Sequence, residues 1–182
     1  MRKGIISLAT LLLMFTATAV FAQRGPAASP TVTVTQAIGN TEMTLVYSRP
    51  SLDGRSLSTL APQGKVWRTG ANTSTQISFN KDVTIGGKAL KAGDYSLWTI
   101  PGDNEWTIII NSVTGNWGTQ YEQKNMAETD VFRFSAPATE LSESVETFRI
   151  DLTDFDKNTK DKANIELAWG NTSVKFPVKV NN

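Results

Sequence analysis

The sequence contains neither cysteine nor histidine, and each absence excludes a kind of chemistry. Without cysteine the chain forms no disulfide and carries no lipobox cysteine, so its stability must come from a hydrophobic core. Without histidine it has no Ser-His-Asp triad, no Cys-His pair and few of the ligands that hold zinc or copper. A bound metal would therefore be a hard ion such as calcium, held by oxygen atoms. We expect no cofactor and no metal.

The sequence also lacks an excess of charge of one sign. Its 182 residues include 18 Lys and Arg against 17 Asp and Glu, for a formal net charge of +1. A nucleic-acid-binding protein would show a basic excess or a basic stripe, and no block of like charges suggests an electrostatic tail. We therefore expect no nucleic acid among its partners.

Long hydrophobic runs are confined to the start of the chain. Arg2 and Lys3 precede an apolar run over residues 5–21, and Val20 and Ala22 are the small residues of a cleavage site. This order is typical of a secretory signal peptide, and the run is shorter than the roughly 20 residues of a membrane span. We expect a signal peptide over residues 1–22, a flexible leader over 23–30, no membrane span after cleavage, and a periplasmic or secreted protein. The alternative is an uncleaved membrane anchor.

Apolar residues alternate with polar ones over most of the remaining chain. The pattern is clear at Met43, Leu45 and Tyr47, and again at Ile165 and Leu167. Alternation with period two is typical of strands that have one buried face and one solvated face. Turns are predicted at residues 86–87, 101–104 and 169–172. These signals predict a single all-β domain over residues 31–182. We expect an antiparallel β-sandwich, of which a jelly roll is one form, with about nine or ten strands and few or no helices.

The segment over residues 47–72 departs from this alternation and concentrates basic and aromatic residues. It contains Arg49, Arg55, Trp67, Arg68 and Asn72. Neighbouring guanidinium groups repel one another unless an anion or carboxylates lie between them. One interpretation is a recognition site for a carboxylate, a phosphate or a polar glycan, with Trp67 as its wall or floor. The other is an internal network in which the arginines bind aspartates and loop carbonyls.

The five tryptophans allow two interpretations as well. Rings that pack between two sheets would form core, whereas an exposed ring would stack on the face of a sugar. Trp169 follows the alternation of Ile165 and Leu167, which places it in the core. Trp117 lies in a turn-like stretch beside Gly118 and is the best candidate for an exposed ring.

Acidic residues cluster near the end of one predicted strand. Asp151, Asp154, Asp156 and Asp161 could hold calcium, but their spacing lacks the glycine and the closing glutamate of an EF-hand loop. We therefore interpret them as a solvated acidic loop. No carboxylate pair is singled out for glycoside hydrolysis.

Several short motifs resemble those of the domain of unknown function 2911 family. They are Tyr47-Ser48-Arg49-Pro50, Gly54-Arg55, residues 64–72, residues 93–97, Ile100-Pro101-Gly102, Glu105-Trp106 and Trp117-Gly118. The resemblance covers nearly all of the chain after the predicted signal peptide, and its most specific part is the run from Trp67 to Asn72. It implies an exported bacterial protein of β type and no established activity or catalytic residue.

We therefore predict an envelope protein that binds a ligand without catalysis. The expected ligand is a small polar or anionic molecule or a glycan, and another envelope protein is a further expected partner. The candidate binding residues are Arg49, Arg55, Trp67, Arg68, Asn72 and Trp117. One alternative is a hydrolase that uses carboxylates or an arginine-lined pocket, and another is a structural partner of an envelope protein.

Overall fold

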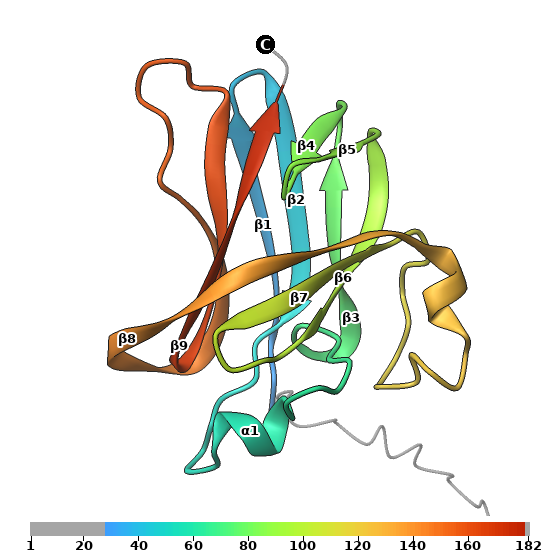
Figure 1. Ribbon diagram of the computed structural model, residues 1–182, viewed down its shortest axis with the longest axis vertical. Coiled ribbons are helices and arrows are strands. Elements are labelled where there is room, and N and C mark those ends of the chain that lie inside the picture. The colour runs from blue at the N-terminus through green and yellow to red at the C-terminus, as the bar shows by residue number, and fades with distance from the viewer. Residues whose placement is uncertain (1–27, 181–182) are drawn as a thin grey trace, which may run out of the picture.

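The computed structural model describes residues 28–180, which form nine antiparallel strands and two single-turn helices (Figure 1). The elements are β1 (Thr31–Ile38), β2 (Thr41–Ser48), α1 (Leu57–Leu60), β3 (Ala71–Phe79), β4 (Val83–Ile85), β5 (Lys88–Leu90), β6 (Gly93–Ile100), β7 (Glu105–Asn111), the 3-10 helix η1 (Met126–Thr129), β8 (Asp130–Thr153) and β9 (Lys162–Val180). The predicted all-β, antiparallel class is confirmed. The predicted signal peptide and most of the predicted leader lie outside the described residues. No helix within residues 28–180 is long and apolar enough to cross a membrane.

The strands form one open sheet in the order β1-β2-β3-β6-β7-β8-β9-β4-β5. The long strand β8 connects the two layers of the fold, because its first part pairs with β7 and its last part pairs with β9. Figure 1 shows β8 crossing the molecule before the chain continues into β9. Side chains from β2, β3, β6 and β7 share one hydrophobic core with side chains from β8 and β9. The two packed layers are therefore parts of a single sheet.

Two of the predicted turns connect neighbouring strands. Gly86 and Gly87 join β4 to β5 with φ angles of 55° and 80°, which glycine adopts without strain. A side-chain carbon at Gly86 would lie 2.3 Å from the ring of Phe134, so the packing also requires glycine there. Residues 101–104 join β6 to β7. The predicted turn at residues 169–172 lies instead within β9, where Gly170 has a φ of 57°.

Four of the five tryptophans are buried, and Trp117 is 66% exposed. Trp67, Trp106 and Trp169 belong to the main core, which confirms the prediction for Trp169. Trp98 belongs to a second, smaller cluster with Ile109, Tyr121 and Met126. Because side chains alternate along β6, Leu97 enters the main core and Trp98 packs on the opposite face of the strand. Tyr121 and Met126, from the segment over residues 112–129, pack on that outer face.

Candidate functional site

Residues 67–72 form a tight turn that connects the core to the surface. The φ angle is 56° at Thr69, 156° at Gly70 and 60° at Asn72. The Thr75 hydroxyl stabilises the turn by donating a hydrogen bond to the Thr69 carbonyl at 2.5 Å. A side-chain carbon at Gly70 would lie 2.9 Å from the Ser48 carbonyl oxygen, which excludes larger residues. The turn places Trp67 in the core and Asn72 at the outer surface.

The three arginines of this region differ in their hydrogen-bond partners. Arg49 donates from Nε to the Phe148 carbonyl at 3.0 Å, and so links the end of β2 to β8. Arg55 donates to the carbonyls of Leu52 and Ser51 at 2.9 Å and 3.0 Å, and stabilises its own loop. Both arginines therefore bind backbone carbonyls, as one of the two interpretations predicted.

Arg68 differs from the other two arginines. Its Nε atom is buried, and among the described residues it has no hydrogen-bond partner. Burial lowers the pKa of its guanidinium, because a charge loses hydration there. Trp67 lies in the core against Trp169 and Phe148, where it does not form the wall of an open site.

Asn72 and Trp117, the other two predicted site residues, line the same hollow. This hollow of about 250 Å³, which we call the Trp117 hollow, lies over β1, β2 and β3. Its polar lining includes the side chains of Thr31, Ser48, Asn72 and Gln76, and no residue that lines it is charged within the part of the chain that the structure describes.

Hydrogen bonds fix the floor of the Trp117 hollow. The Asn72 amide donates to Ser48 Oγ at 3.2 Å and to the Ser29 carbonyl at 3.2 Å. Ser48 Oγ also bonds Thr31 Oγ1 at 3.1 Å. Ser74 Oγ is buried at the same hollow without a hydrogen-bond partner among residues 28–180. The floor is thus a preformed set of hydroxyl and amide groups.

The backbone around Trp117 is held although its ring is exposed. Trp117 forms an isolated β-bridge with Thr73. The Gly118 amide donates to the Asn72 carbonyl at 2.9 Å, and the Ser74 amide donates to the Asn116 carbonyl at 2.8 Å. These bonds make residues 116–118 a short extension of the sheet beside β3. The ring therefore extends at the hollow from a backbone that is held in place.

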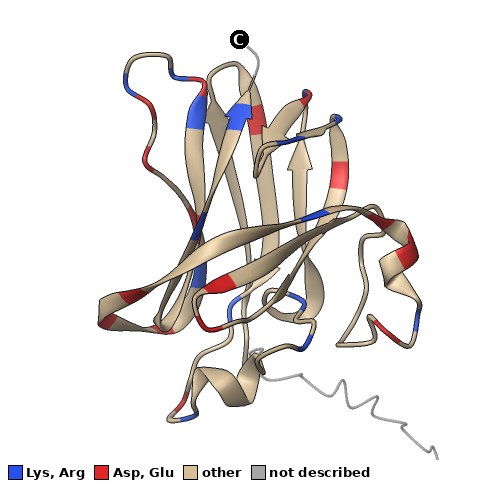
Figure 2. Cartoon of the chain, in the orientation of Figure 1, with Lys and Arg blue, Asp and Glu red and all other residues tan. Residues whose placement is uncertain are grey.

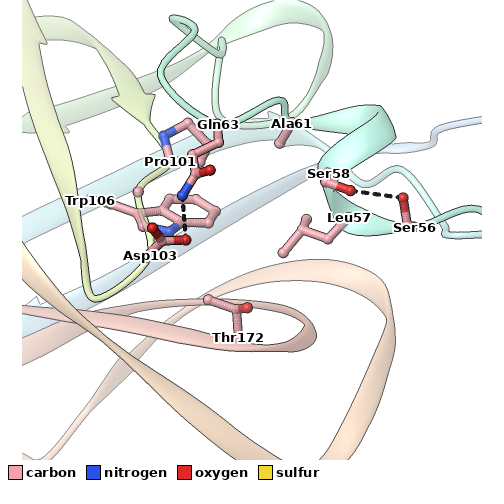
Figure 3. Close-up of a pocket in the computed structure, with 10 residues that line it drawn as sticks. Ser56, Leu57, Ser58, Ala61, Gln63, Pro101, Asp103, Trp106 and Thr172 are labelled. Carbon is pink, nitrogen blue, oxygen red and sulfur yellow. Dashed lines mark hydrogen bonds between the residues drawn. The ribbon is translucent and has the colours of Figure 1, made fainter.

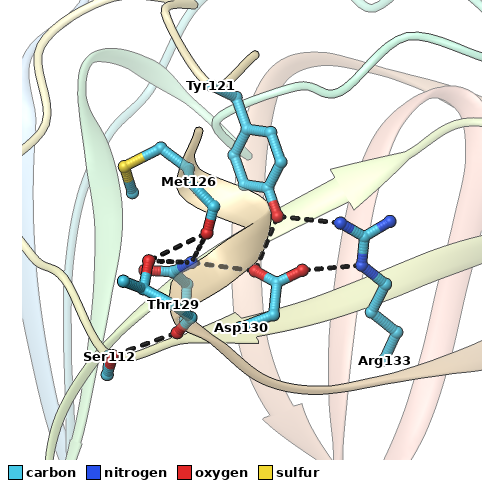
Figure 4. Close-up of polar contacts among 7 residues, drawn as sticks. Ser112, Tyr121, Met126, Thr129, Asp130 and Arg133 are labelled. Carbon is cyan, nitrogen blue, oxygen red and sulfur yellow. Dashed lines mark hydrogen bonds and ion pairs between the residues drawn. The ribbon is translucent and has the colours of Figure 1, made fainter. Parts of the chain in front are cut away.

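A polar network fastens the segment that carries Trp117 (Figure 4). The Asp130 carboxylate accepts hydrogen bonds from Tyr121 at 2.6 Å, from Arg133 Nε at 2.7 Å and from the Asn111 amide at 2.8 Å. Arg133 also donates to the Tyr121 hydroxyl at 2.9 Å. Burial, together with the hydrogen bond to Asp130, raises the pKa of Tyr121. The Ser112 amide, which donates to the Thr129 carbonyl at 3.0 Å, closes the base of the segment.

No local sequence pattern predicts this network. Asp130 binds Arg133, three positions further along β8, and not an arginine of the 47–72 segment. Tyr121 and Asn111 come from a loop and from β7, and only the fold brings them to Asp130.

A second depression, which we call the Trp106 groove, lies at the end of the molecule that carries α1 (Figure 1), and Figure 3 shows the residues that line it. It has a volume of about 360 Å³ and is lined by α1, by the β6–β7 turn and by β9. Leu57, Ala61, Pro101 and Trp106 form its apolar part. Sequence reasoning missed this groove because its walls come from three distant parts of the chain.

The carboxylates of the acidic loop after β8 accept hydrogen bonds from other groups of the protein. Asp154 accepts hydrogen bonds from Asn164 and Lys175 at 3.1 Å each, and Asp156 accepts from the backbone amides of Asn158 and Thr159. These bonds lower the pKa of both aspartates. Among residues 28–180, no group of three or more acidic residues is placed to hold a metal ion.

The fold and the Trp117 hollow define an all-β protein with a preformed polar hollow beside an exposed tryptophan. The chain belongs to the family described as "Protein of unknown function (DUF2911)", which matches residues 29–178. The predicted family membership is thereby confirmed. Comparisons with curated proteins and with solved structures gave no match.

Proposed function

We propose that this protein is an exported, non-catalytic envelope module that binds a neutral glycan at the Trp117 hollow. The observation that carries the proposal is the ring of Trp117, which is 66% exposed on a backbone held against β3. Large aromatic side chains that remain exposed on a fixed backbone are suited to stacking on the apolar face of a sugar ring. Because the backbone beneath the ring is already ordered, binding has to order only the side chain.

The polar groups of the hollow suit the hydroxyl groups of a sugar. Asn72, Ser48 and Gln76 offer amide and hydroxyl groups within one hollow of about 250 Å³. That volume is below the range for drug-sized ligands, so it suits a single sugar ring of a longer chain. Because the described lining has no charge, a neutral sugar is favoured over the anionic ligand that the arginines had suggested.

The residues that line the Trp117 hollow support binding rather than hydrolysis. Glycoside hydrolysis commonly uses two carboxyl groups that flank the scissile bond. Within the described part of the chain, no Asp or Glu lines the Trp117 hollow.

The signal-like order of residues 1–22 supports export, which would bring the protein to the glycans of the cell envelope.

Fluorescence of Trp117 offers a direct test of glycan binding. Neutral oligosaccharides would be titrated while the quenching of tryptophan fluorescence by acrylamide is measured. Trp117 should account for most of this quenching, because the other tryptophans are buried. A bound sugar should protect Trp117 from acrylamide. Calorimetry should show that Trp117→Ala abolishes binding and that Asn72→Gly, which keeps the positive φ accessible, weakens it.

Phe155→Ala is the matched control, because Phe155 is another exposed aromatic residue at 38% exposure. This variant should bind glycans as the unaltered protein does. Binding that survives Trp117→Ala, or a panel of neutral glycans without any binder, would refute the proposed function.

A further inference from the structure

The Trp106 groove continues into a second depression of different chemical character. This adjoining hollow of about 370 Å³ shares Asp103 and Thr172 with the groove. Asp103 lies in the β6–β7 turn, and Thr172 lies in β9. One surface therefore joins an apolar end to a polar end.

The apolar end is rigid. Leu57 is the first residue of α1, whose N-terminus is capped by the Ser56 side chain. Trp106 packs edge-on against Trp67 in the core, with ring centroids 6.1 Å apart. The Gly64 amide donates to the Pro101 carbonyl at 2.9 Å, and this bond ties the loop after α1 to the β6–β7 turn. The walls of the groove are therefore preformed.

The polar end is acidic, and no Lys or Arg of the described residues lines it. Asp103 and Glu140 both line it and are exposed to solvent. Neither carboxylate forms an ion pair with any cation in residues 28–180, and Asp103 accepts a hydrogen bond from the Gln63 amide. Figure 2 shows acidic positions in the β6–β7 turn and on the neighbouring bend of β8.

We propose that this surface binds an extended peptide segment of a partner protein, with an apolar side chain in the Trp106 groove and a cationic amine between Asp103 and Glu140. The charge complementarity identifies the occupant, because a neutral glycan supplies no cation for the two carboxylates. A lysine side chain and a free peptide N-terminus supply the same ammonium group. Exposed ion pairs are screened by salt, so binding is weak and falls as ionic strength rises. This site is separate from the Trp117 hollow and does not depend on the proposed glycan binding.

Three short peptides separate these contributions. Acetylated leucyl-lysine amide carries a side-chain ammonium, leucyl-glutamine amide carries a free α-amine, and acetylated leucyl-glutamine amide carries no cation. Chemical-shift titration at low salt should show that at least one cationic peptide binds about twofold to fivefold more tightly than the uncharged one. The stronger of the two cationic peptides identifies the source of the amine.

Matched variants test both ends of the surface. Glu140→Gln should remove most of the preference for a cation, whereas Glu143→Gln, at an exposed glutamate outside the lining, should leave it unchanged. Leu57→Ala should weaken all three peptides, whereas Leu60→Ala, on the same helical turn but outside the groove lining, should not. Thermal melts would show that each variant is folded, and Trp117→Ala should leave peptide binding intact.

Three outcomes would overturn this proposal. They are no binding by any peptide, equal binding of the charged and uncharged peptides, and a cation preference that survives Glu140→Gln. A dimer in solution that Leu57→Ala dissociates would instead assign the groove to a second copy of the chain.

Discussion

Trp67 and Trp169 stack at the centre of the protein, with ring centroids 5.5 Å apart and planes inclined by 18°. Trp67 begins the 67–72 turn, and Trp169 comes from β9 in the other layer. Phe148 packs on Trp67 at 5.0 Å and completes the contact. Aromatic pairs of this kind contribute about 0.5–1.5 kcal/mol beyond the burial of their surface. The turn that presents Asn72 to the Trp117 hollow is therefore anchored in the core by its first residue.

Gly70→Ala should reduce the free energy of unfolding by about 2 kcal/mol or more, as chemical denaturation would show. The added carbon would meet the Ser48 carbonyl oxygen at 2.9 Å, and the φ of 156° disfavours alanine. Gly64→Ala is the control, because Gly64 also has a positive φ but no atom of the described residues lies within 4 Å of the added carbon. Equal losses in the two variants would contradict the predicted clash.

Arg68→Met should leave the free energy of unfolding unchanged or raise it. The substitution removes a partly buried charge whose Nε has no partner among the described residues. Arg49→Met should instead lower the free energy of unfolding by about 1–2 kcal/mol, because the Phe148 carbonyl loses its charged donor. Denaturant titration of both variants checks the pair, and the reverse order would show that Arg68 has a stabilising role.

The free energy of unfolding should fall as the pH rises above about 10, because the ionisation of Tyr121 is unfavourable in the fold. Its pKa in the fold is raised above the ordinary value of 10.0, so its contribution is complete below that value and is lost as pH rises toward the folded pKa. Tyr121→Phe should remove this part of the alkaline dependence and cost about 1–2 kcal/mol at pH 8, because Asp130 loses a donor. Melts between pH 8 and pH 11 test this, using roughly the range in which tyrosine titrates.

Some alkaline dependence should remain in Tyr121→Phe. Burial also raises the pKa of Tyr47 and Tyr95, the other two tyrosines of the chain. A variant whose alkaline dependence equals that of the unaltered protein would show that the hydrogen bond between Tyr121 and Asp130 does not contribute.

Trp117→Phe should abolish most of the tryptophan emission that acrylamide quenches. The other four tryptophans are no more than 4% exposed, whereas Trp117 is 66% exposed. The free energy of unfolding should change by less than about 0.5 kcal/mol, as for most surface positions. Substantial quenching that persists in this variant would show that a second tryptophan is accessible.

Mass spectrometry of the protein isolated from its native cells or their medium should find Gln23 at the N-terminus. The prediction depends on the signal-like order of residues 1–22. A mature chain that retains these residues would support the membrane-anchor alternative.

The sequence by itself determined the local features of this protein. Alternation at Met43, Leu45 and Tyr47 predicted β2, because a strand places every second side chain on one face. The glycine pair at residues 86–87 predicted the β4–β5 turn, because these positions need positive φ angles. The same local logic assigned Trp169 to the core and selected Trp117 as the most exposed ring.

Only the tertiary structure decided which groups meet. Arg49 and Arg68 both belong to the basic segment over residues 47–72. Arg49 reaches the Phe148 carbonyl, whereas the Nε atom of Arg68 is buried without a partner among residues 28–180. Asn72 and Trp117 share a hollow because residues 116–118 extend the sheet beside β3. Partners such as these are far apart in the chain. Their meeting depends on strand order and on the path of β8 between the layers, which a residue's immediate neighbours do not specify.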